Sequence, residues 1–340
     1  MDPGRAAARL LAEFGLPTDV VAVDEVGRAW SNQVWSVRTT RGHYAIKELL
    51  NPWGDPLWRE WLAEASRFEL RAVDAGVHSP RPLPTSAGDA LVDLDGRTFR
   101  AHEWIDTSRP CPDGPVSKDI ARAVARDLAI MHALHVAPTR QDVFPTPTTE
   151  TCDAWPELVT ELQRVGSPYA QDAERIVPEV ATIREWFVRR PDGRRVMSHG
   201  DIDQKNLLLT DGTVWLVDWD VAAPWLPAEE AMRTAMSLAS WTSPAIVDVF
   251  LSAYFREGGD AFEPGATLLA HDLRIGLDWL DRCLRVAAGL LSAEDHRVAE
   301  ARQQVDADLR RLPERVATAA DLPRPSTKPH ESLRSHKFGP

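Results

Sequence analysis

The feature that most constrains the fold of this chain is a short predicted hairpin with polar residues at both of its ends. Residues 207–209 and 214–217 are apolar runs of the kind that form strands. They are joined by a segment containing Asp211-Gly212, a dipeptide typical of tight hairpin turns. A hairpin brings the chain back to its starting point. Asn206 and Asp218, which flank it, are therefore predicted to lie side by side.

The loop before the hairpin adds a third polar group to this predicted site. It reads His199-Gly200-Asp201, then four residues, then Asn206. Phosphoryl transfer from ATP needs one carboxylate that orients the attacking hydroxyl. It also needs an amide oxygen and a second carboxylate that hold Mg²⁺ on the phosphates. We therefore predict Asp201 as the catalytic residue and Asn206 and Asp218 as the metal ligands.

This segment resembles the catalytic loop and metal-binding aspartate of the aminoglycoside phosphotransferase/choline kinase family, whose members share the protein-kinase fold. Gly200 stands where protein kinases have the arginine of His-Arg-Asp, and Asp218-Trp219-Asp220 stands where they have Asp-Phe-Gly. Both departures are usual for the small-molecule branch of that superfamily. The resemblance implies a kinase-like fold, ATP and Mg²⁺ as cofactors, and a small-molecule hydroxyl as the phosphate acceptor.

Composition excludes several other classes of partner. The 340 residues suit two domains or one large bilobal domain, and the net charge of −12 argues against nucleic acid or an anionic membrane. The same charge is compatible with a cationic acceptor.

The three cysteines are widely spaced without a C-x-x-C pair, which indicates a reducing, cytoplasmic setting and no structural zinc. Neither a signal peptide nor an apolar run long enough to span a membrane is predicted.

The pattern along the chain predicts an α+β, protein-kinase-like bilobal fold. A small antiparallel β lobe with one inserted helix is expected over 1–104, a larger helical lobe over 105–320, and a disordered tail over 321–340. In the first lobe the predicted strands are 20–23, 34–37, 43–49, 90–94 and 98–104, and the helices are 6–14 and 58–75. In the second lobe the predicted helices are 117–134, 155–164, 172–189, 228–240, 244–257, 266–288 and 293–311.

Lys47 is predicted to hold the nucleotide phosphates, because it ends an otherwise apolar strand in the manner of the V-A-I-K position of kinases. Its acidic partner is expected on the helix that begins near Trp58. Glu60 and Glu64 are four residues apart and share one face, whereas Glu69 lies off that face. Glu64 is the favoured partner, and Glu60 is the alternative.

Two further nucleotide contacts are predicted from their order along the chain. The loop over 27–32 lacks the G-x-G-x-x-G pattern but resembles the shorter Gly/Ser-Asn loop of the phosphotransferase family, so Ser31 and Asn32 are expected to contact phosphate. Glu103 and Ile105 occupy the hinge position, where backbone groups would pair with the adenine edge.

The acceptor is the least constrained part of the prediction. In the resembled family it sits between the catalytic loop and the C-terminal helices, where Asp220, Asp272, Asp278 and Trp279 are candidates. Glu229, Glu230 and Asp281 lie on the same helices, and acids with an aromatic would suit a polyamine such as an aminoglycoside. A solvated helix face would show the same acids. Asp220 could equally be a second metal contact or a helix cap.

The predicted activity is therefore ATP-dependent phosphorylation of an aminoglycoside or similar antibiotic, with a role in resistance implied by the resemblance. Alternatives are a kinase of choline, homoserine or an amino sugar, and a kinase-shaped regulatory binding protein. Within the catalytic loop, His199 is expected to brace the backbone. Asp203 and Lys205 are expected to be solvated loop charges, and the alternative is that either contacts phosphate or substrate.

Overall fold

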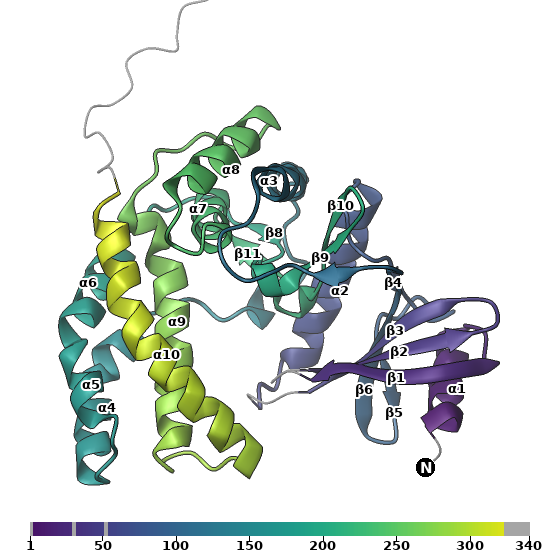
Figure 1. Cartoon of the computed structure of the whole chain (residues 1–340), viewed down its shortest axis with the longest axis horizontal. Coiled ribbons are helices and arrows are strands. Elements are labelled where there is room, and N and C mark those ends of the chain that lie inside the picture. The colour runs from purple at the N-terminus through teal and green to yellow at the C-terminus, as the bar shows by residue number, and fades with distance from the viewer. Residues whose placement is uncertain (1–2, 29–31, 51–53, 323–340) are drawn as a thin grey trace, which may run out of the picture. The chain divides into compact units, whose positions relative to one another are not determined.

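The computed structural model describes residues 3–28, 32–50 and 54–322, which form two compact units (Figure 1). Unit 1 comprises Met1–Thr146 and Gly193–Asp260, and unit 2 comprises Pro147–Asp192 and Ala261–Pro340. Unit 1 thus joins the predicted β lobe to the catalytic loop and its hairpin. The predicted lobe boundary at residue 104 stays a prediction. The predicted disordered tail lies outside the described residues, apart from Asp321 and Leu322.

A six-stranded antiparallel sheet forms the first part of unit 1. Its strands follow the order β1-β2-β3-β6-β4, with β5 also paired to β6, and their bounds are β1 Val20–Arg28, β2 Asn32–Thr39, β3 His43–Leu49, β4 Pro82–Leu83, β5 Val92–Leu94 and β6 Arg97–Glu103. The predicted hairpin around Asp95-Gly96 is confirmed. Both turn residues have positive φ, at 54° and 77°, as a tight two-residue turn requires.

The two faces of this sheet have opposite character because side chains alternate along each strand. Ile46 and Phe99 face helix α1 (Pro3–Glu13) in an apolar core. A cavity of about 390 Å³ opens on this face. Lys47 and Arg100, the neighbours of those residues, lie directly opposite each other on the other face, toward helix α2 (Trp58–Asp74). The sheet therefore separates an apolar core from a charged face.

The rest of unit 1 carries the catalytic loop. Its elements are β7 Arg109–Pro110, α3 Lys118–Ala133, η1 Gln141–Val143, β8 Val196–Ser198, η2 Gln204–Asn206, β9 Leu207–Thr210, β10 Thr213–Leu216, η3 Trp219–Val221, β11 Ala223–Trp225, α7 Pro227–Leu238 and α8 Pro244–Arg256. The predicted hairpin of β9 and β10 is confirmed, with Thr210 opposite Thr213 across the turn. Ser117 caps α3 by accepting a hydrogen bond from the Ile120 N–H at 3.3 Å.

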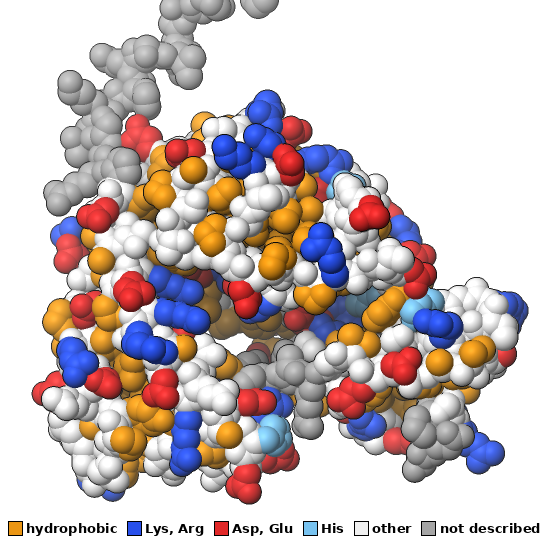
Figure 2. Space-filling view, in the orientation of Figure 1, with side chains coloured by type: hydrophobic (Ala, Val, Ile, Leu, Met, Phe, Trp, Pro, Cys, Tyr) orange, Lys and Arg blue, Asp and Glu red, His pale blue; other side chains and the backbone are white. Residues whose placement is uncertain are grey.

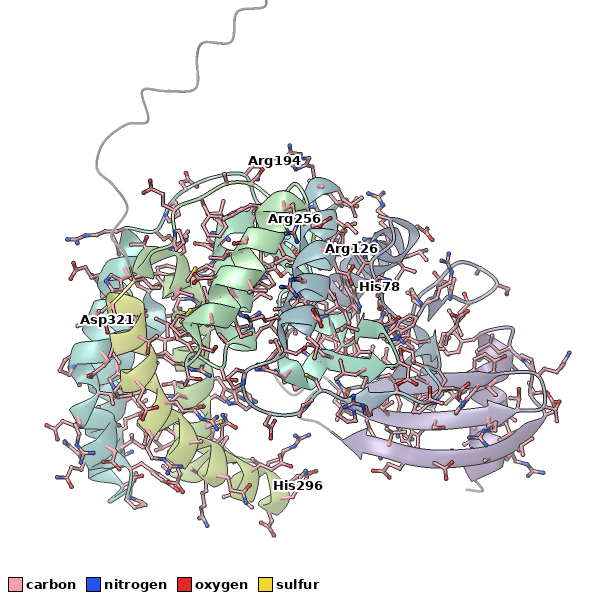
Figure 3. The ribbon with its side chains drawn as sticks, turned by 45° about the horizontal axis from the view of Figure 1, so that its top comes forward. His78, Arg126, Arg194, Arg256, His296 and Asp321 are labelled. Carbon is pink, nitrogen blue, oxygen red and sulfur yellow. The ribbon has the colours of Figure 1, made fainter. Side chains whose placement is uncertain are left out.

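The connector after α2 ties these elements together. His78 and Arg126 lie near each other (Figure 3), with His78 Nδ1 3.3 Å from Arg126 Nη1 and 3.3 Å from Asp127 Oδ2. The His78 carbonyl accepts a hydrogen bond from the Leu216 N–H at 2.8 Å. The connector is thereby bound both to α3 and to the strand that leads to Asp218.

Unit 2 consists of the helices α4 Glu150–Arg164, α5 Ala170–Arg175, α6 Val177–Val188, α9 Ala266–Ala287 and α10 Asp295–Ala320. The single helix predicted over 172–189 is two, and the second has Pro178 in its first turn, a favourable place for proline. The helix predicted to stop at 311 continues to Ala320, because Leu312, Val316 and Ala319 extend its buried face.

On the face shown in Figure 2, acidic and basic side chains are interspersed rather than gathered by sign. Within residues 3–28, 32–50 and 54–322, no helix has the length and hydropathy needed to cross a membrane.

Candidate active site

The catalytic loop connects β8 to β9 and requires glycine at residue 200. Gly200 has a φ of +79°, and a Cβ at this position would lie 2.8 Å from the Val221 carbonyl oxygen and 2.9 Å from Trp225 Nε1. Any other residue would strain the backbone at this positive φ, and its Cβ would collide with these two atoms. The glycine that replaces the kinase arginine is therefore needed for the path of the loop.

Helix α7 holds both backbone polar groups of Gly200. The Gly200 N–H donates to Glu230 Oε1 at 2.7 Å, and Arg233 Nη1 donates to the Gly200 carbonyl. The other oxygen of Glu230 accepts from His132 Nε2 at 2.9 Å. Burial raises the pKa of Glu230, but His132 and the other hydrogen-bond donors outweigh burial and hold that pKa below its ordinary value. Glu230 thus works as an ionised clamp on the loop.

The expectation that Glu229 and Glu230 line an acceptor cleft is wrong. Both side chains are fully buried, Glu230 in the clamp and Glu229 at 3.3 Å from Arg195 Nη1. They follow Pro227 at the start of α7, and it is the packing of the first turn of that helix that turns them inward.

Asp201 is surrounded by donors on both carboxylate oxygens. Oδ1 accepts from Arg233 Nη2 at 2.9 Å, and Oδ2 lies 3.0 Å from both Lys205 Nζ and Asn206 Nδ2. Burial raises the pKa of Asp201, but Lys205 and Arg233 outweigh burial and hold it well below the ordinary range. Asp201 is therefore ionised and oriented. The Lys205 side chain is 64% exposed, as a solvated loop charge would be, but it also pairs with Asp201.

His199 braces the loop in its neutral form. Its Nδ1 accepts from the Asp201 N–H at 3.3 Å. Its Nε2 lies 3.1 Å from the Val217 carbonyl, which can only accept, so Nε2 carries the proton. Burial is the main cause that lowers the pKa of His199 below its ordinary value. The ring also packs against Trp219, with centroids 4.6 Å apart.

Asn206 and Asp218 lie at the same end of the hairpin. The Val217 N–H donates to the Asn206 carbonyl at 3.0 Å, which extends the pairing of the two strands by one step. Asp218 has a φ of 69°, and 35% of its side chain is exposed. The structure thus brings together the two groups predicted to bind metal.

The donors at this end of the hairpin fit Mg²⁺. Amide and carboxylate oxygens are the hard ligands that Mg²⁺ prefers. Over the described part of the chain there is no cluster of three or more His, Cys, Asp or Glu side chains that could hold a metal without other ligands. A Mg²⁺ ion that is shared with substrate phosphates uses only one or two protein carboxylates, so Asn206 and Asp218 would suffice to hold one.

Lys47 reaches this end of the hairpin from the sheet. Its Nζ lies 2.5 Å from Asp218 Oδ1 and 2.6 Å from Asp220 Oδ2. Burial lowers the pKa of Lys47, but the two carboxylates outweigh burial and raise it above its ordinary value. The ammonium is therefore charged and lies beside the groups that we assign to the metal.

The prediction that Glu64 pairs with Lys47 is wrong. Glu64 accepts from the backbone N–H groups of Thr139 at 3.0 Å and Arg140 at 3.1 Å, and it also pairs with Arg67 at 2.5 Å. Its carboxylate therefore anchors the loop after α3. The helical period shows which residues share a face, but it does not show which face meets the sheet.

Asp220 is not placed for the substrate role that we predicted. Its side chain is only 9% exposed, and its two oxygens contact Lys47 and, at 2.8 Å, Arg100 Nη1. Arg100 was missed in the sequence, although a signal was present. Like Lys47, it is a cation within a predicted strand, and it lies between the apolar residues Phe99 and Ala101. Arg233 was missed as well, and its signal was a cation three residues after Glu230 on the same helix.

The remaining predicted contacts stay predictions. Ser31 lies outside the described residues, and Asn32 is buried at the start of β2, opposite Leu49. The Glu103 N–H donates to the Arg81 carbonyl at 3.0 Å. The Ile105 carbonyl accepts from Ser108 Oγ at 2.9 Å.

The candidate acceptor residues Asp272, Asp278 and Trp279 all belong to α9 of unit 2. Asp278 accepts from Thr151 Oγ1 at 2.5 Å and pairs with Arg274 one turn earlier on its own helix. These contacts support the packing of α9, and an acceptor role for the three residues stays a prediction.

Comparison with known proteins adds independent information. The family model described as the phosphotransferase enzyme family matches residues 23–268. The structure of spectinomycin phosphotransferase in complex with ADP and spectinomycin is similar with a TM-score of 0.71 and 14% identity, over 92% of this chain and 98% of that one. A choline/ethanolamine kinase family protein from Mesorhizobium loti is similar with a TM-score of 0.59 and 19% identity, over 94% and 99% of the two chains.

A third similar structure is amicoumacin kinase in complex with AMP-PNP, Ca²⁺ and Ami, with a TM-score of 0.59, 10% identity and coverage of 92% and 94%. These similarities confirm the predicted α+β, protein-kinase-like fold class. A search of curated proteins finds no match to this chain.

Proposed function

The chain belongs to the phosphotransferase enzyme family, and we propose that it transfers the γ-phosphate of ATP to a hydroxyl group of a small molecule. The observation that carries this proposal is the convergence of four groups in unit 1. Asp201 contacts Asn206, the hairpin pairing leads from Asn206 to Asp218, and Asp218 contacts Lys47 at 2.5 Å. This is the set that phosphoryl transfer requires.

Each group has a role that follows from its surroundings. Asn206 and Asp218 would hold Mg²⁺, which supplies charge neutralisation at the phosphates. Lys47 stays protonated and is the cation for phosphate oxygens. Asp201 orients the acceptor hydroxyl and receives its proton as the new oxygen–phosphorus bond forms.

The low pKa of Asp201 indicates how it acts. A carboxylate held by Arg233 and Lys205 is a weak base, so it cannot remove a hydroxyl proton before bond formation begins. The main contribution of Asp201 is to orient the acceptor hydroxyl, and it receives the hydroxyl proton only after the bond to phosphorus has begun to form. The rigid hold of Asp201 by its three partners suits that task.

The best candidate for the acceptor is an aminoglycoside or a similar antibiotic. The support is the net charge of −12 and the likeness to a protein that was solved in complex with ADP and spectinomycin. The second candidate is a small metabolite such as choline, homoserine or an amino sugar. The likeness to a choline/ethanolamine kinase family protein favours that reading.

A kinase-shaped binding protein without activity is a weaker proposal. Lys47, Asp201, Asn206 and Asp218 are all present, and the structure holds Asp201 ionised. A protein that only binds nucleotide has no need of an oriented carboxylate beside the metal-binding end of the hairpin.

A coupled ADP-release assay tests the proposed function. The purified protein with Mg·ATP is tested against aminoglycosides, other hydroxylated antibiotics, choline, homoserine and amino sugars. Asp201→Asn is the inactive variant. Asp211→Asn is its matched control, because Asn-Gly preserves the turn at the far end of the same hairpin. A signal that Asp201→Asn abolishes and Asp211→Asn retains establishes phosphoryl transfer and the acceptor class. Silence with every compound, in protein that binds Mg·ATP, would reject the proposed acceptors.

Binding measurements separate the two acidic roles. We expect Asp201→Asn to leave the affinity for Mg·ATP within several-fold of the wild type, whereas Asp218→Ala weakens it strongly. Unchanged Mg·ATP affinity in Asp218→Ala would reject that residue as a metal ligand. Loss of binding in folded Asp201→Asn would reject the role of Asp201.

A further inference from the structure

Two buried cations lie side by side on one face of the sheet. Lys47 in β3 and Arg100 in β6 are direct cross-strand partners, and both side chains lie on the same face. Like charges in this position repel. Asp220 lies between them and offsets this repulsion, with Oδ2 2.6 Å from Lys47 Nζ and Oδ1 2.8 Å from Arg100 Nη1.

Arg100 continues the contact to α2. Its Nη2 pairs with Glu69 Oε2, and Glu69 Oε1 accepts from His102 Nε2 at 2.9 Å. The contacts therefore form a chain of alternating cations and anions, which we name the ion-pair chain. Its members, in order, are Lys47, Asp220, Arg100 and Glu69. No more than 10% of any of the four side chains is exposed, so each depends on its neighbours for charge compensation.

The two aspartates that contact Lys47 differ in what else they can do. Asp218 is partly exposed and lies at the hairpin end beside Asn206, where a metal ion would take its oxygens. Asp220 is enclosed between Lys47 and Arg100. When Asp218 serves a metal, Asp220 is the carboxylate that still holds the ammonium of Lys47.

We propose that Asp220, rather than a glutamate of α2, is the positioning residue for Lys47, and that Arg100 links this pair to α2 through Glu69. The inference rests on the proposed function, because it assumes that Lys47 binds nucleotide phosphates. The proposal differs from the predicted arrangement, in which a glutamate of α2 pairs directly with Lys47. Helix α2 acts on Lys47 through an arginine and an aspartate instead of through a direct ion pair.

A double-mutant cycle on metal-free ADP binding tests this proposal. The full chain is titrated with ADP in EDTA as wild type, Lys47→Met, Asp220→Asn and the double variant. We expect Asp220→Asn to weaken binding several-fold when Lys47 is present and to have no further effect in the Lys47→Met background. An equal effect of Asp220→Asn in both backgrounds would overturn the proposal.

Glu48 provides a matched control. It is a buried, ion-paired carboxylate next to Lys47 in sequence, but it pairs with Arg97 on the opposite face, with Arg97 Nε 2.6 Å from Glu48 Oε1. Glu48→Gln should have the same effect with and without Lys47. Glu64→Gln is a second comparison. Coupling to Lys47 in that variant, and none in Asp220→Asn, would restore the glutamate of α2 as the partner.

Arg100→Lys keeps the proposal testable if Asp220→Asn fails to fold. The shorter ammonium keeps the charge but cannot reach Asp220 and Glu69 in the bidentate manner of the guanidinium. We expect weaker ADP binding that depends on Lys47, and an effect independent of Lys47 would overturn the link to α2. Wild-type protein that binds no ADP would reject the proposed function itself. Wild-type protein that binds ADP, with additive effects of the Lys47 and Asp220 substitutions, would reject only the role of the ion-pair chain.

Discussion

Arg233 holds Asp201 and the residue before it at the same time. Its Nη2 lies 2.9 Å from Asp201 Oδ1, and its Nη1 donates to the carbonyl of Gly200. Its guanidinium also lies over the ring of Trp225, 5.5 Å from the centroid. One side chain of α7 therefore orients the carboxylate that we assign to catalysis and, together with Lys205, favours its charged form.

Arg233→Met should lower kcat by roughly ten- to a hundredfold, because Asp201 loses its orientation. It should also raise the pKa of Asp201, since a cation that favours the carboxylate is gone. The acidic limb of the kcat/KM profile then moves to higher pH. Arg233→Lys keeps the charge and should move the limb less. Identical pH profiles in Arg233→Met and wild type would contradict this account.

Lys205→Ala should lower kcat more than it changes the KM for ATP. The ammonium lies 3.0 Å from Asp201 Oδ2, but most of the side chain is exposed, so folding depends little on this pair. We expect a loss of about tenfold in kcat and an unchanged thermal midpoint. Lys205→Arg preserves the charge and should retain most of the activity. A variant with full kcat would return Lys205 to the role of a solvated charge.

Gly200→Ala and Gly212→Ala form a matched pair of substitutions. Both glycines have positive φ, at 79° and 89°, but only the Cβ at 200 would meet other atoms within 4 Å. Gly212→Ala should cost about 1–2 kcal/mol of stability, from backbone strain alone, and stay active. Gly200→Ala should cost more and lose activity, since the loop must shift away from Val221. Urea unfolding and the kinase assay measure both effects, and equal costs would refute the crowding argument.

The protein should lose stability as pH falls below about 6.5. Burial is the main cause that lowers the pKa of both His199 and His102, so the folded state keeps them neutral. The unfolded chain takes up these protons below the ordinary value of 6.5, and the folded chain does so only at lower pH. The stabilisation is therefore complete above pH 6.5 and declines as pH falls toward the folded pKa values.

Urea midpoints at pH 7.5 and pH 5.5 measure this decline. His199→Asn removes one of the two titrating groups, and asparagine can still offer a donor and an acceptor. The difference between the two midpoints should be smaller in this variant than in the wild type. A variant with the full wild-type decline would show that His199 does not contribute.

Local sequence patterns predicted those parts of the site that depend on neighbouring residues. The turn at Asp211-Gly212 and its flanking apolar runs predicted a hairpin, and the structure places Asn206 and Asp218 at one end of it. The first turn of α3 and the hairpin around Asp95-Gly96 were predicted in the same way. Each depends on hydrogen bonds that span only a few positions.

Ion-pair partners that are far apart in the sequence could not be predicted from local patterns. Lys47 and Asp218 are 171 positions apart, and Arg100 meets Asp220 across 120. The period of α2 grouped Glu60 with Glu64, but the packing of that helix turned Glu69 toward Arg100 and Glu64 toward residues 139–140. The strands β7, β8 and β11 have two or three residues each, too few for a periodic pattern to indicate.

The sequence by itself determined the groups that we propose to take part in the reaction, because Asp201, Asn206 and Asp218 are brought together by one loop and one turn. Only the tertiary structure decided which charges hold those groups in place. Arg233, Asp220 and Arg100 acquire their roles when a helix, a short turn and a strand from distant parts of unit 1 pack together. A buried charge needs an opposite charge nearby, and its partner is whichever residue the packing brings within reach.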